Sequence, residues 1–374
     1  MKIEELLRGM LAAGASDLFV FAEKKPFYKI MNEMKEASSD LVDLEDMTSF
    51  MDSVLSEEGR KRLSEHGSCD AGLTLFETMR FRINFFIRQG MPSFVARFVP
   101  IVDLSFEELS LPSCLKSLAE KPRGLILVCG PAGSGKSTTV AAMINHINAK
   151  FAKHIVTIED PVEYVHSDKK SVVTQRELGS DTFDFSEALR NVVRESPDVI
   201  VIGEMRDLDT MKAALNAALT GHLVISTVHT SNVTLCVERI INHFPDHLRE
   251  QASSDLALAI EGIVAHRLLS GSNNSGKLYP ALEILISTPL VRKTISDRRF
   301  HDLDEIMKRG SEEGMRTFAR SLADMCKEGR ISLETGALAA TNRDEFMFLV
   351  QGMESGSDTF KFEEEDDQEK SLNM

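Results

Sequence analysis

One short stretch constrains the fold of this chain more than any other. GPAGSGKST, residues 130–138, matches the pattern G-x-x-x-x-G-K-[ST], in which glycines let the backbone wrap around phosphate groups. The apolar run GLILVC precedes it, and an amphipathic run with Val140, Ile144 and Ile147 follows. A strand, a glycine-rich turn and a helix in this order are typical of a phosphate-binding loop. We therefore predict a nucleotide site; the alternative interpretation is a glycine-rich turn without a ligand.

The positions of this loop have distinct expected roles. Amides at the start of the helix face the phosphates, Lys136 reaches the β and γ oxygens, and the Ser137 hydroxyl can ligate Mg²⁺. The residues predicted to bind the nucleotide here are Gly130, Pro131, Ala132, Gly133, Ser134, Gly135, Lys136, Ser137 and Thr138.

From residue 124 onward, apolar segments alternate with helical patterns, which indicates a largely parallel sheet covered on both faces. Three of these strands end in carboxylates or histidines: Glu163 follows VTIED, Glu204 follows VIVIG, and His229 follows LVISTV. Ligands of α/β proteins bind where parallel strands end, so we expect these side chains to converge beside the phosphate loop. Taken singly, such a carboxylate can also be a cap or a salt-bridge partner, and such a histidine a core residue.

Two histidines bracket the last of these strands. His222 and His229 flank a six-residue apolar run, which sets them about 20 Å apart if the strand is fully extended. At most one of them can therefore lie near a γ-phosphate, unless the ends of the strand bend.

Residues 1–100 carry a different pattern. A helical run at the start is expected to stop at Gly14, SDLFVFAE and FYKIMNEM each predict a short strand, and LEDMTSFMDSVLSEEGRKRLSEHG predicts one helix that ends at Gly67. In ETMRFRINFFIRQGMPSFVARFVP, apolar residues alternate with polar ones such as Arg80 and Arg82, which predicts an antiparallel hairpin with one arginine-bearing face. We expect a small α+β domain.

The charge and the cysteines narrow the function classes. The net charge is −15, of which the eight acids and two lysines of residues 354–374 contribute −6. These residues are expected to form a disordered acidic tail. The acidity, and the lack of a basic, aromatic-rich segment, argue against a nucleic-acid partner and so against a nucleic-acid translocase. Five scattered cysteines without a C-x-x-C pair favour a reducing compartment and argue against structural zinc.

Nothing in the sequence predicts insertion into a membrane. Glu4, Glu5 and Arg8 fall where a secretory signal would need an apolar core. No run of 18 apolar residues occurs. We therefore expect a soluble, cytoplasmic protein that reaches a membrane only through a partner.

Taken together, the motifs resemble the secretion-type ATPases of type IV pili, and within them the retraction motors PilT and PilU. The resemblance covers roughly residues 1–350, and RIINHFP, GMRTF and the acidic ending are closer to PilU than to PilT. It implies ATP and Mg²⁺ as cofactors and a homo-hexameric ring. The motifs that carry it are GPAGSGKSTT, TIEDPVEYVH, VTQRELG, SEALRNVVRESPDVIVIGEMRD and TGHLVISTVHT.

The same resemblance implies an α/β protein with a defined order of domains. That order is a PAS-like N-terminal domain (1–100), a proline-containing linker (101–122), a RecA-like P-loop ATPase core (123–290), a helical C-terminal subdomain (291–353) and the acidic tail (354–374).

By similarity, Glu163 is the general base that orients the attacking water, and Glu204 assists Mg²⁺ and water. His222 and His229 are implied to act as sensors. Arginines from the N-terminal domain are implied to reach the phosphates, and its arginine-bearing face offers Arg80, Arg82 and Arg97.

The function implied is an ATPase motor that powers type IV pilus retraction, and hence twitching motility, through an inner-membrane platform protein. Such a motor would be cytoplasmic and peripheral at the inner membrane. The alternative is an accessory nucleotide-binding subunit that assists a second retraction ATPase with little hydrolysis of its own.

Overall fold

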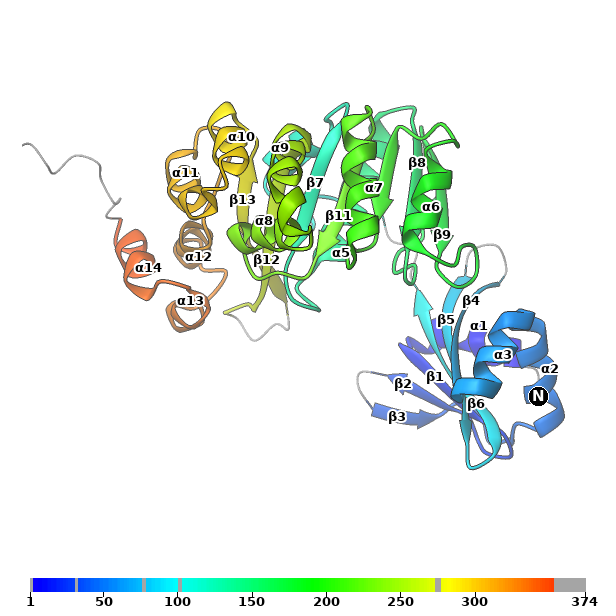
Figure 1. The fold of residues 1–374 in the computed structure, drawn as a ribbon. Coiled ribbons are helices and arrows are strands. Elements are labelled where there is room, and N and C mark those ends of the chain that lie inside the picture. Colours follow the sequence, from blue (N-terminus) through cyan, green and yellow to red (C-terminus); the bar gives the residue numbers. More distant parts are fainter. Residues whose placement is uncertain (1–2, 31–32, 76–78, 100–102, 273–276, 353–374) are drawn as a thin grey trace, which may run out of the picture.

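The computed structural model describes residues 3–30, 33–75, 79–99, 103–272 and 277–352, and within them the chain forms two β-sheets. A six-stranded antiparallel sheet belongs to the N-terminal part, and a seven-stranded, mostly parallel sheet belongs to the rest of the chain. Figure 1 shows the smaller sheet attached at one end of the larger one.

The N-terminal sheet has the strand order β3-β2-β1-β6-β5-β4. Buried side chains of its three helices pack on the apolar face of the sheet, as the alternating hairpin pattern predicts. Phe81, Ile83 and Phe85 are fully buried, whereas Arg82 between them is exposed. The elements are α1 (Ile3–Ala13), β1 (Asp17–Phe21), β2 (Phe27–Ile30), β3 (Glu33–Glu36), α2 (Leu44–Val54), α3 (Glu57–His66), β4 (Ser68–Leu75), β5 (Met79–Arg88) and β6 (Met91–Val99).

Two local predictions for this part are wrong. The single helix expected to end at Gly67 is two helices, because Leu55 is buried in an extended conformation and the hydroxyl of Ser56 accepts a hydrogen bond from the amide of Gly59 to begin α3. The run FYKIMNEM, expected as one strand, supplies two antiparallel strands, β2 and β3. The predicted end of the second helix is confirmed, since Gly67 has a left-handed backbone (φ 75°).

The larger sheet has the order β13-β12-β7-β11-β10-β8-β9, and only its edge pair β12/β13 is antiparallel. The elements that build it are α4 (Cys114–Ala119), β7 (Gly124–Cys129), α5 (Lys136–Lys150), β8 (His154–Glu159), β9 (Val172–Glu177), α6 (Phe185–Val192), β10 (Val199–Ile202), α7 (Leu208–Leu219), β11 (Leu223–Val228), α8 (Val233–Asn242), η1 (Asp246–Leu248), α9 (Arg249–Ala259), β12 (Ile260–Ser270) and β13 (Leu278–Ile286).

Helices cover both faces of this sheet. Along β7, Leu125 and Leu127 pack with side chains of α6 to α9, whereas Ile126 and Val128 pack with those of α4 and α5. Strands buried on both faces explain why the sequence shows continuous apolar runs there instead of alternation. The predicted α/β class is confirmed.

Short helices complete the described chain at the end of the molecule opposite the N-terminal sheet (Figure 1). They are α10 (Pro289–Ser296), η2 (Phe300–Asp302), α11 (Leu303–Arg309), α12 (Phe318–Lys327), α13 (Leu333–Ala339) and α14 (Arg343–Val350). The acidic tail expected over residues 354–374 lies outside the described residues. In the part of the chain that the structure describes, no helix has the length and apolar character needed to span a bilayer.

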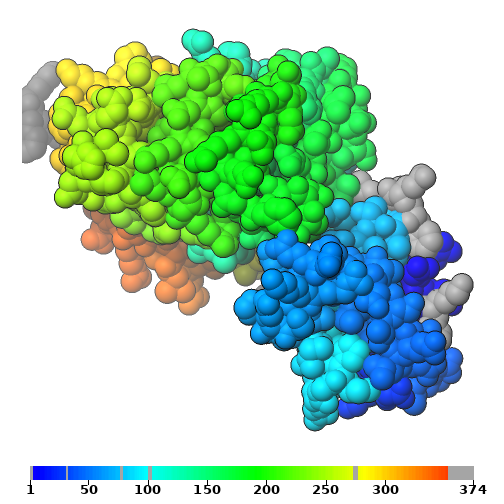
Figure 2. Space-filling view, turned by 45° about the vertical axis from the view of Figure 1, so that its right-hand side comes forward, coloured from blue at the N-terminus to red at the C-terminus, as the bar shows by residue number. Residues whose placement is uncertain are grey.

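The N-terminal part and the larger part are in contact. In the space-filling view, the N-terminal residues lie directly against the larger part near the end that carries β8 and β9 (Figures 1 and 2). Residues of the N-terminal sheet can therefore contact the end of β9, which lies beside the carboxyl end of the parallel strand β8.

Candidate nucleotide site

The predicted phosphate loop connects β7 to α5. Gly130, Gly133 and Gly135 have φ angles of 153°, 74° and 92°, values that favour glycine. At Gly130, a Cβ atom would lie only 2.4 Å from Oγ of Ser134 and 3.0 Å from the carbonyl oxygen of His266. The loop therefore needs glycine both for its backbone conformation and for close packing on β12.

Lys136, the first residue of α5, is folded back over this loop. It is 7% exposed, and its Nζ donates hydrogen bonds of 2.9 Å to the carbonyl oxygens of Gly130 and Pro131. Burial lowers the pKa of the Lys136 ammonium, while Cys129 and the carboxylates of Glu163 and Glu204 oppose that shift. The cation is thus held by carbonyl groups next to the amides that bind phosphate in such loops.

A cavity of about 210 Å³ opens beside the loop. The carboxyl ends of β8, β10 and β11 border it, because these strands are parallel neighbours in the sheet. The structure therefore brings together the strand ends that the sequence singles out. Among the residues that line the cavity are Lys136, Ser137, Glu163, Glu204, Thr227 and His229.

Glu204 lies in the turn that follows β10. The preceding Gly203 donates its amide to the carbonyl oxygen of Ile158, 2.8 Å away, and a Cβ atom there would lie 3.2 Å from that oxygen. The Glu204 side chain is 8% exposed; its Oε1 contacts Arg206, and its Oε2 lies 3.2 Å from Nε2 of His229. Oε2 is buried and, apart from this contact with His229, accepts no hydrogen bond from the described residues, so it is available to a cation.

His229 and His222 occupy opposite ends of β11. His229 lines the cavity, whereas Nδ1 of His222 lies 3.0 Å from the carbonyl oxygen of Ala217 at the end of α7. The structure thus brings His229 to the phosphate loop and does not bring His222 there within one chain, as the length of the strand predicts.

Glu163 stands in an exposed position on the loop that follows β8 and lines the cavity. The same loop touches α5, since the hydroxyl groups of Tyr164 and Thr138 are 2.9 Å apart. Behind it, Glu159 accepts hydrogen bonds from Thr157 and Gln175. Burial raises the pKa of Glu159. The exposed Glu163 can face a ligand, whereas the Glu159 carboxylate is already hydrogen-bonded at the end of β8.

The three arginines expected at the phosphates do not line this cavity. Arg82 lies 3.8 Å from Asp70 in its own sheet. Arg97 pairs with Asp17 at 2.8 Å. The third arginine pairs with a carboxylate of the larger sheet: Nη2 of Arg80 lies 2.7 Å from Oε2 of Glu177.

Two buried histidines lie near the loop: His266 belongs to no predicted motif, and His166 ends the motif TIEDPVEYVH without a predicted role. His266 on β12 is fully buried beneath the phosphate loop, and neither ring nitrogen has a hydrogen-bond partner. Burial lowers its pKa to about 3, with the positive charge of Lys136 as a second cause. His166 lines the cavity, lies 2.8 Å from Oδ1 of Asn145, and has its pKa lowered to about 4 by burial. Both are therefore neutral near pH 7.

The donors of this cavity fit Mg²⁺ held jointly by protein and phosphate. Mg²⁺ in nucleotide sites takes one or two protein oxygens and completes its shell with phosphate and water. Ser137 supplies a hydroxyl and Glu204 a buried oxygen without a hydrogen-bond partner. Among the described residues, no cluster of three or more histidines, cysteines or acidic residues could hold a metal by itself.

Comparison with known proteins shows the family to which the chain belongs. The sequence profile of the type II/IV secretion system protein family matches residues 3–321. The type IV pilus ATPase PilU of Pseudomonas aeruginosa is 36% identical over 359 residues, which cover 96% of this chain and 94% of that protein. The type IV pilus retraction ATPase PilT of the same organism is 36% identical over 334 residues, 89% of this chain and 96% of that protein.

A solved structure extends the likeness to three dimensions. The crystal structure of the pilus retraction motor PilT with bound ADP superposes with a TM-score of 0.83 at 38% identity, covering 92% of this chain and 98% of that one. Identities of 36% to 38% over nearly the whole length and a matching fold both indicate the same family. The chain belongs to the type IV pilus retraction ATPase family of the type II/IV secretion system proteins.

Proposed function

We propose that this chain hydrolyses ATP with Mg²⁺ and powers type IV pilus retraction as a homo-hexameric ring. The observation that supports it most is the cavity that unites Lys136 and Ser137 with Glu163, Glu204 and His229. Phosphoryl transfer needs positioned charge and an oriented nucleophile more than covalent chemistry. A cation, two carboxylates and a neighbouring histidine around one phosphate loop are suited to that task.

Each side chain has a proposed role. The loop amides and Lys136 would hold the β and γ oxygens. Ser137 and Glu204 would hold Mg²⁺, which would neutralise negative charge on the transferred group. Glu163, exposed to the cavity, accepts a hydrogen bond from the attacking water and orients it. His229, next to Glu204, contacts the γ-phosphate side of the site and distinguishes ATP from ADP. His222 would act as a sensor only from the far end of β11, and so in contact with another part of the ring.

The proposed motor step is closure of the N-terminal part over the nucleotide. Closure in this manner brings catalytic groups together and lets product release reset the shape of the enzyme. Arg80, Arg82 and Arg97 lie on that part, and each is bound to a carboxylate in this arrangement. We expect Arg82 and Arg97 to reach phosphates after closure, within a subunit or across a subunit boundary, and Arg80 to do so only in subunits where it has left Glu177. The retraction platform in the inner membrane is the proposed partner, contacted from the cytoplasmic side.

Phosphate release by the purified protein tests this proposal. ATP should be hydrolysed with Mg²⁺ and not with excess chelator, and size-exclusion chromatography with light scattering should give six chains per particle. ATP binding without measurable hydrolysis would favour the accessory subunit. Deletion of the gene separates the biological roles, because a principal motor leaves hyperpiliated, non-twitching cells. An accessory subunit leaves pili that still retract under the second ATPase.

A further inference from the structure

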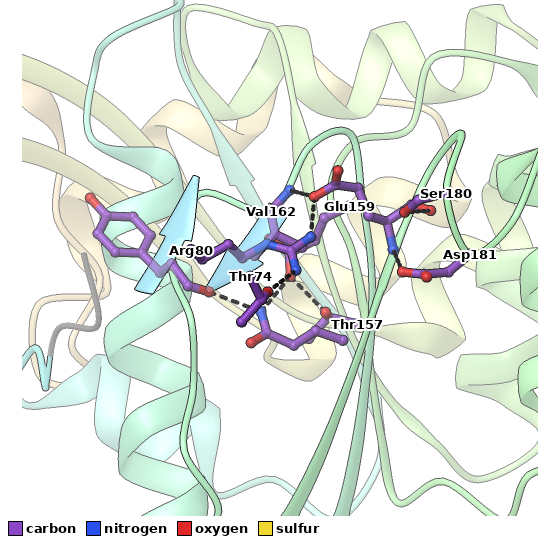
Figure 3. Close-up of polar contacts among 10 residues, drawn as sticks. Thr74, Arg80, Thr157, Glu159, Val162, Ser180 and Asp181 are labelled. Atoms are coloured by element: carbon purple, nitrogen blue, oxygen red, sulfur yellow. Dashed lines mark hydrogen bonds and ion pairs between the residues drawn. The ribbon is translucent and has the colours of Figure 1, made fainter. Parts of the chain in front are cut away.

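Glu177, the last residue of β9, is a buried carboxylate that joins the two parts of the molecule. It is 6% exposed, and its Oε2 accepts a 2.7 Å hydrogen bond from Nη2 of Arg80 on β5 and a 3.1 Å bond from the amide of Val162. Figure 3 shows the Arg80 side chain of the N-terminal sheet directed at the chain around Val162, with the Thr74 hydroxyl of the same sheet directed at Arg80. One carboxylate oxygen thus contacts both the N-terminal sheet and the residue that precedes Glu163.

The backbone around Glu177 is fixed by a short turn. Its amide donates to Oδ2 of Asp181 at 2.8 Å, and its carbonyl oxygen accepts from the amides of Asp181 at 2.9 Å and Thr182 at 3.3 Å. The strand pairing sets Glu177 opposite Glu159, at the point where the Glu163 loop leaves β8. The carboxylate is therefore presented to that loop from a rigid support.

The facing N-terminal strand provides the space for this contact. At Gly72 on β4, a Cβ atom would lie 2.7 Å from Oε1 of Glu177 and 2.8 Å from Nη2 of Arg80. Any other residue at this position would displace one of the two partners. Gly72 therefore allows the ion pair to form.

β9 holds the Glu163 loop on both sides of the proposed base. Glu177 accepts from the amide of Val162, and the side chain of Gln175 donates to the carbonyl oxygen of Tyr164, 2.9 Å away. These two contacts flank Glu163 in the sequence. The side-chain amide of Gln175 donates both of its hydrogen bonds within the larger part, to Tyr164 and Glu159. Of these two loop contacts, the one that involves the N-terminal part is therefore the contact through Glu177.

Burial makes the Glu177 contact depend on Arg80. A buried carboxylate without a cation is strongly disfavoured, because its desolvation is no longer compensated. When the N-terminal part moves and withdraws Arg80, Glu177 has to turn toward water or find another cation. In turning, it releases the amide of Val162 and with it one side of the Glu163 loop.

We infer that Glu177 is a positioning residue for the proposed base Glu163, and that Arg80 couples this position to the placement of the N-terminal part. This inference rests on the proposed function. Two arrangements of the N-terminal part then correspond to two states of the loop, one with Glu163 fixed for hydrolysis and one with it free.

Turnover kinetics and hydrogen exchange test this inference together. Glu177→Ala should lower kcat by about 10- to 100-fold, because small misplacements of a catalytic group have effects of that size. The KM for ATP should change by less than about threefold, since the phosphate loop is untouched. Glu177→Gln keeps an oxygen for Val162 but weakens the pairing with Arg80, so its loss should be smaller. It also serves if Glu177→Ala does not fold.

The Arg80 contact is tested by a double-mutant cycle. If Arg80 acts through Glu177, the loss of kcat in Arg80→Gln/Glu177→Gln should be no larger than that of the more damaging single variant, because contacting residues are non-additive. Glu195→Gln is the matched control, since Glu195 pairs at 3.0 Å with Arg176, the neighbour of Glu177 on β9, and within the described chain no hydrogen bond or ion pair joins it to the Glu163 loop. Its turnover should equal that of the unchanged protein.

Hydrogen exchange of a peptide spanning residues 160–165 gives a readout that does not require hydrolysis. Exchange should be faster in Glu177→Ala and Arg80→Gln than in the unchanged protein and in Glu195→Gln. Unchanged exchange, fully additive losses of kcat, or a loss confined to KM would each overturn the inference. If the unchanged protein hydrolyses no ATP, the proposed function fails, and the exchange data still decide whether Glu177 and Arg80 hold this loop.

Discussion

The two ends of the parallel sheet differ in how far their polar groups are satisfied. At the amino ends, the side chain of Asp198 accepts from the amide of His154 at 2.8 Å, and the amide of Gly124 donates to the carbonyl oxygen of His222 at 3.0 Å. At the carboxyl ends, buried polar atoms of Ser134, Glu204 and His266 have no hydrogen-bond partner among the described residues. The polar groups named at the amino ends are hydrogen-bonded to each other, whereas those at the carboxyl ends remain able to bind a ligand.

This difference indicates, without any comparison to other proteins, that a ligand binds at the carboxyl ends of the strands. A buried polar atom without a partner costs about 1–3 kcal/mol, so several of them around one cavity indicate a site where a ligand completes the bonding. Lys136 differs from these atoms, because it donates hydrogen bonds to two carbonyl oxygens of its own loop. A phosphate can replace those partners and form stronger, charge-assisted bonds. The predictions below contrast the two ends.

The largest effect is expected from the ends of α5. Lys136→Ala should lower ATP hydrolysis by about 10³-fold or more, comparable with the loss of other charge-stabilising groups in phosphoryl transfer. Lys150→Ala removes a lysine from the other end of the same helix, where it pairs with Glu120, and should leave turnover near the unchanged value. Phosphate release measured side by side checks both, and a Lys136→Ala rate within tenfold of the unchanged protein contradicts the site.

A nearly equal loss is expected at the proposed base. Glu163→Gln should bind ATP normally but turn over about 10²- to 10³-fold more slowly, because general-base assistance is worth up to about 10⁴-fold. Binding of a fluorescent ATP analogue and single-turnover hydrolysis separate these two steps. Hydrolysis at the unchanged rate in Glu163→Gln would disprove the assignment and direct attention to Glu204.

The sequence predicts local features of the site and misses its long-range ones. GPAGSGKST, the strand ends at Glu204 and His229, and the alternating hairpin are patterns within a few residues, so each is visible in one dimension. The pair of Arg80 and Glu177 joins positions 97 apart, and no local pattern marks it. His266 is likewise ordinary in sequence, and only the fold sets it beneath the phosphate loop.

The errors in the N-terminal part have the same physical origin. The run from Leu44 to His66 has helical periodicity throughout, yet the chain bends at Leu55 because burying that side chain outweighs continuing the helix. Tertiary packing overrides local propensity at such points. The arginine-bearing face is predicted correctly. The carboxylates that its arginines contact are not, because they depend on strand pairing within the N-terminal sheet and on the packing of that sheet against the larger one.

A smaller effect should distinguish the two ends of β11. His229→Gln should lower kcat by about tenfold, because it removes a group 3.2 Å from Glu204 and beside the phosphate loop. His222→Gln should lower it less, since that ring contacts α7 at the other end of the strand. Steady-state kinetics of both variants check the order. An equal or larger loss in His222→Gln would show that His222 acts on a nucleotide across a subunit boundary.

The smallest effect concerns stability and follows from the buried ring of His266. The unfolded chain binds a proton at this histidine near pH 6.5, whereas the folded ring stays neutral because burial lowers its pKa to about 3. The contribution is therefore fully present above pH 6.5 and is lost as the pH falls toward 3. Linkage gives a fall of about 1 kcal/mol between pH 6.5 and 5.5.

The variant His266→Gln isolates this term, because glutamine does not titrate while the other histidines still do. Urea unfolding at pH 6.5 and 5.5 should give a free energy of unfolding that falls by about 1 kcal/mol less in the variant than in the unchanged protein. An identical fall in both would mean that the ring takes up a proton in the folded state. A buried ring that is protonated between pH 6.5 and 5.5 needs an acceptor in the phosphate loop, so the carboxyl end of the sheet would have one polar group fewer without a partner than the structure indicates.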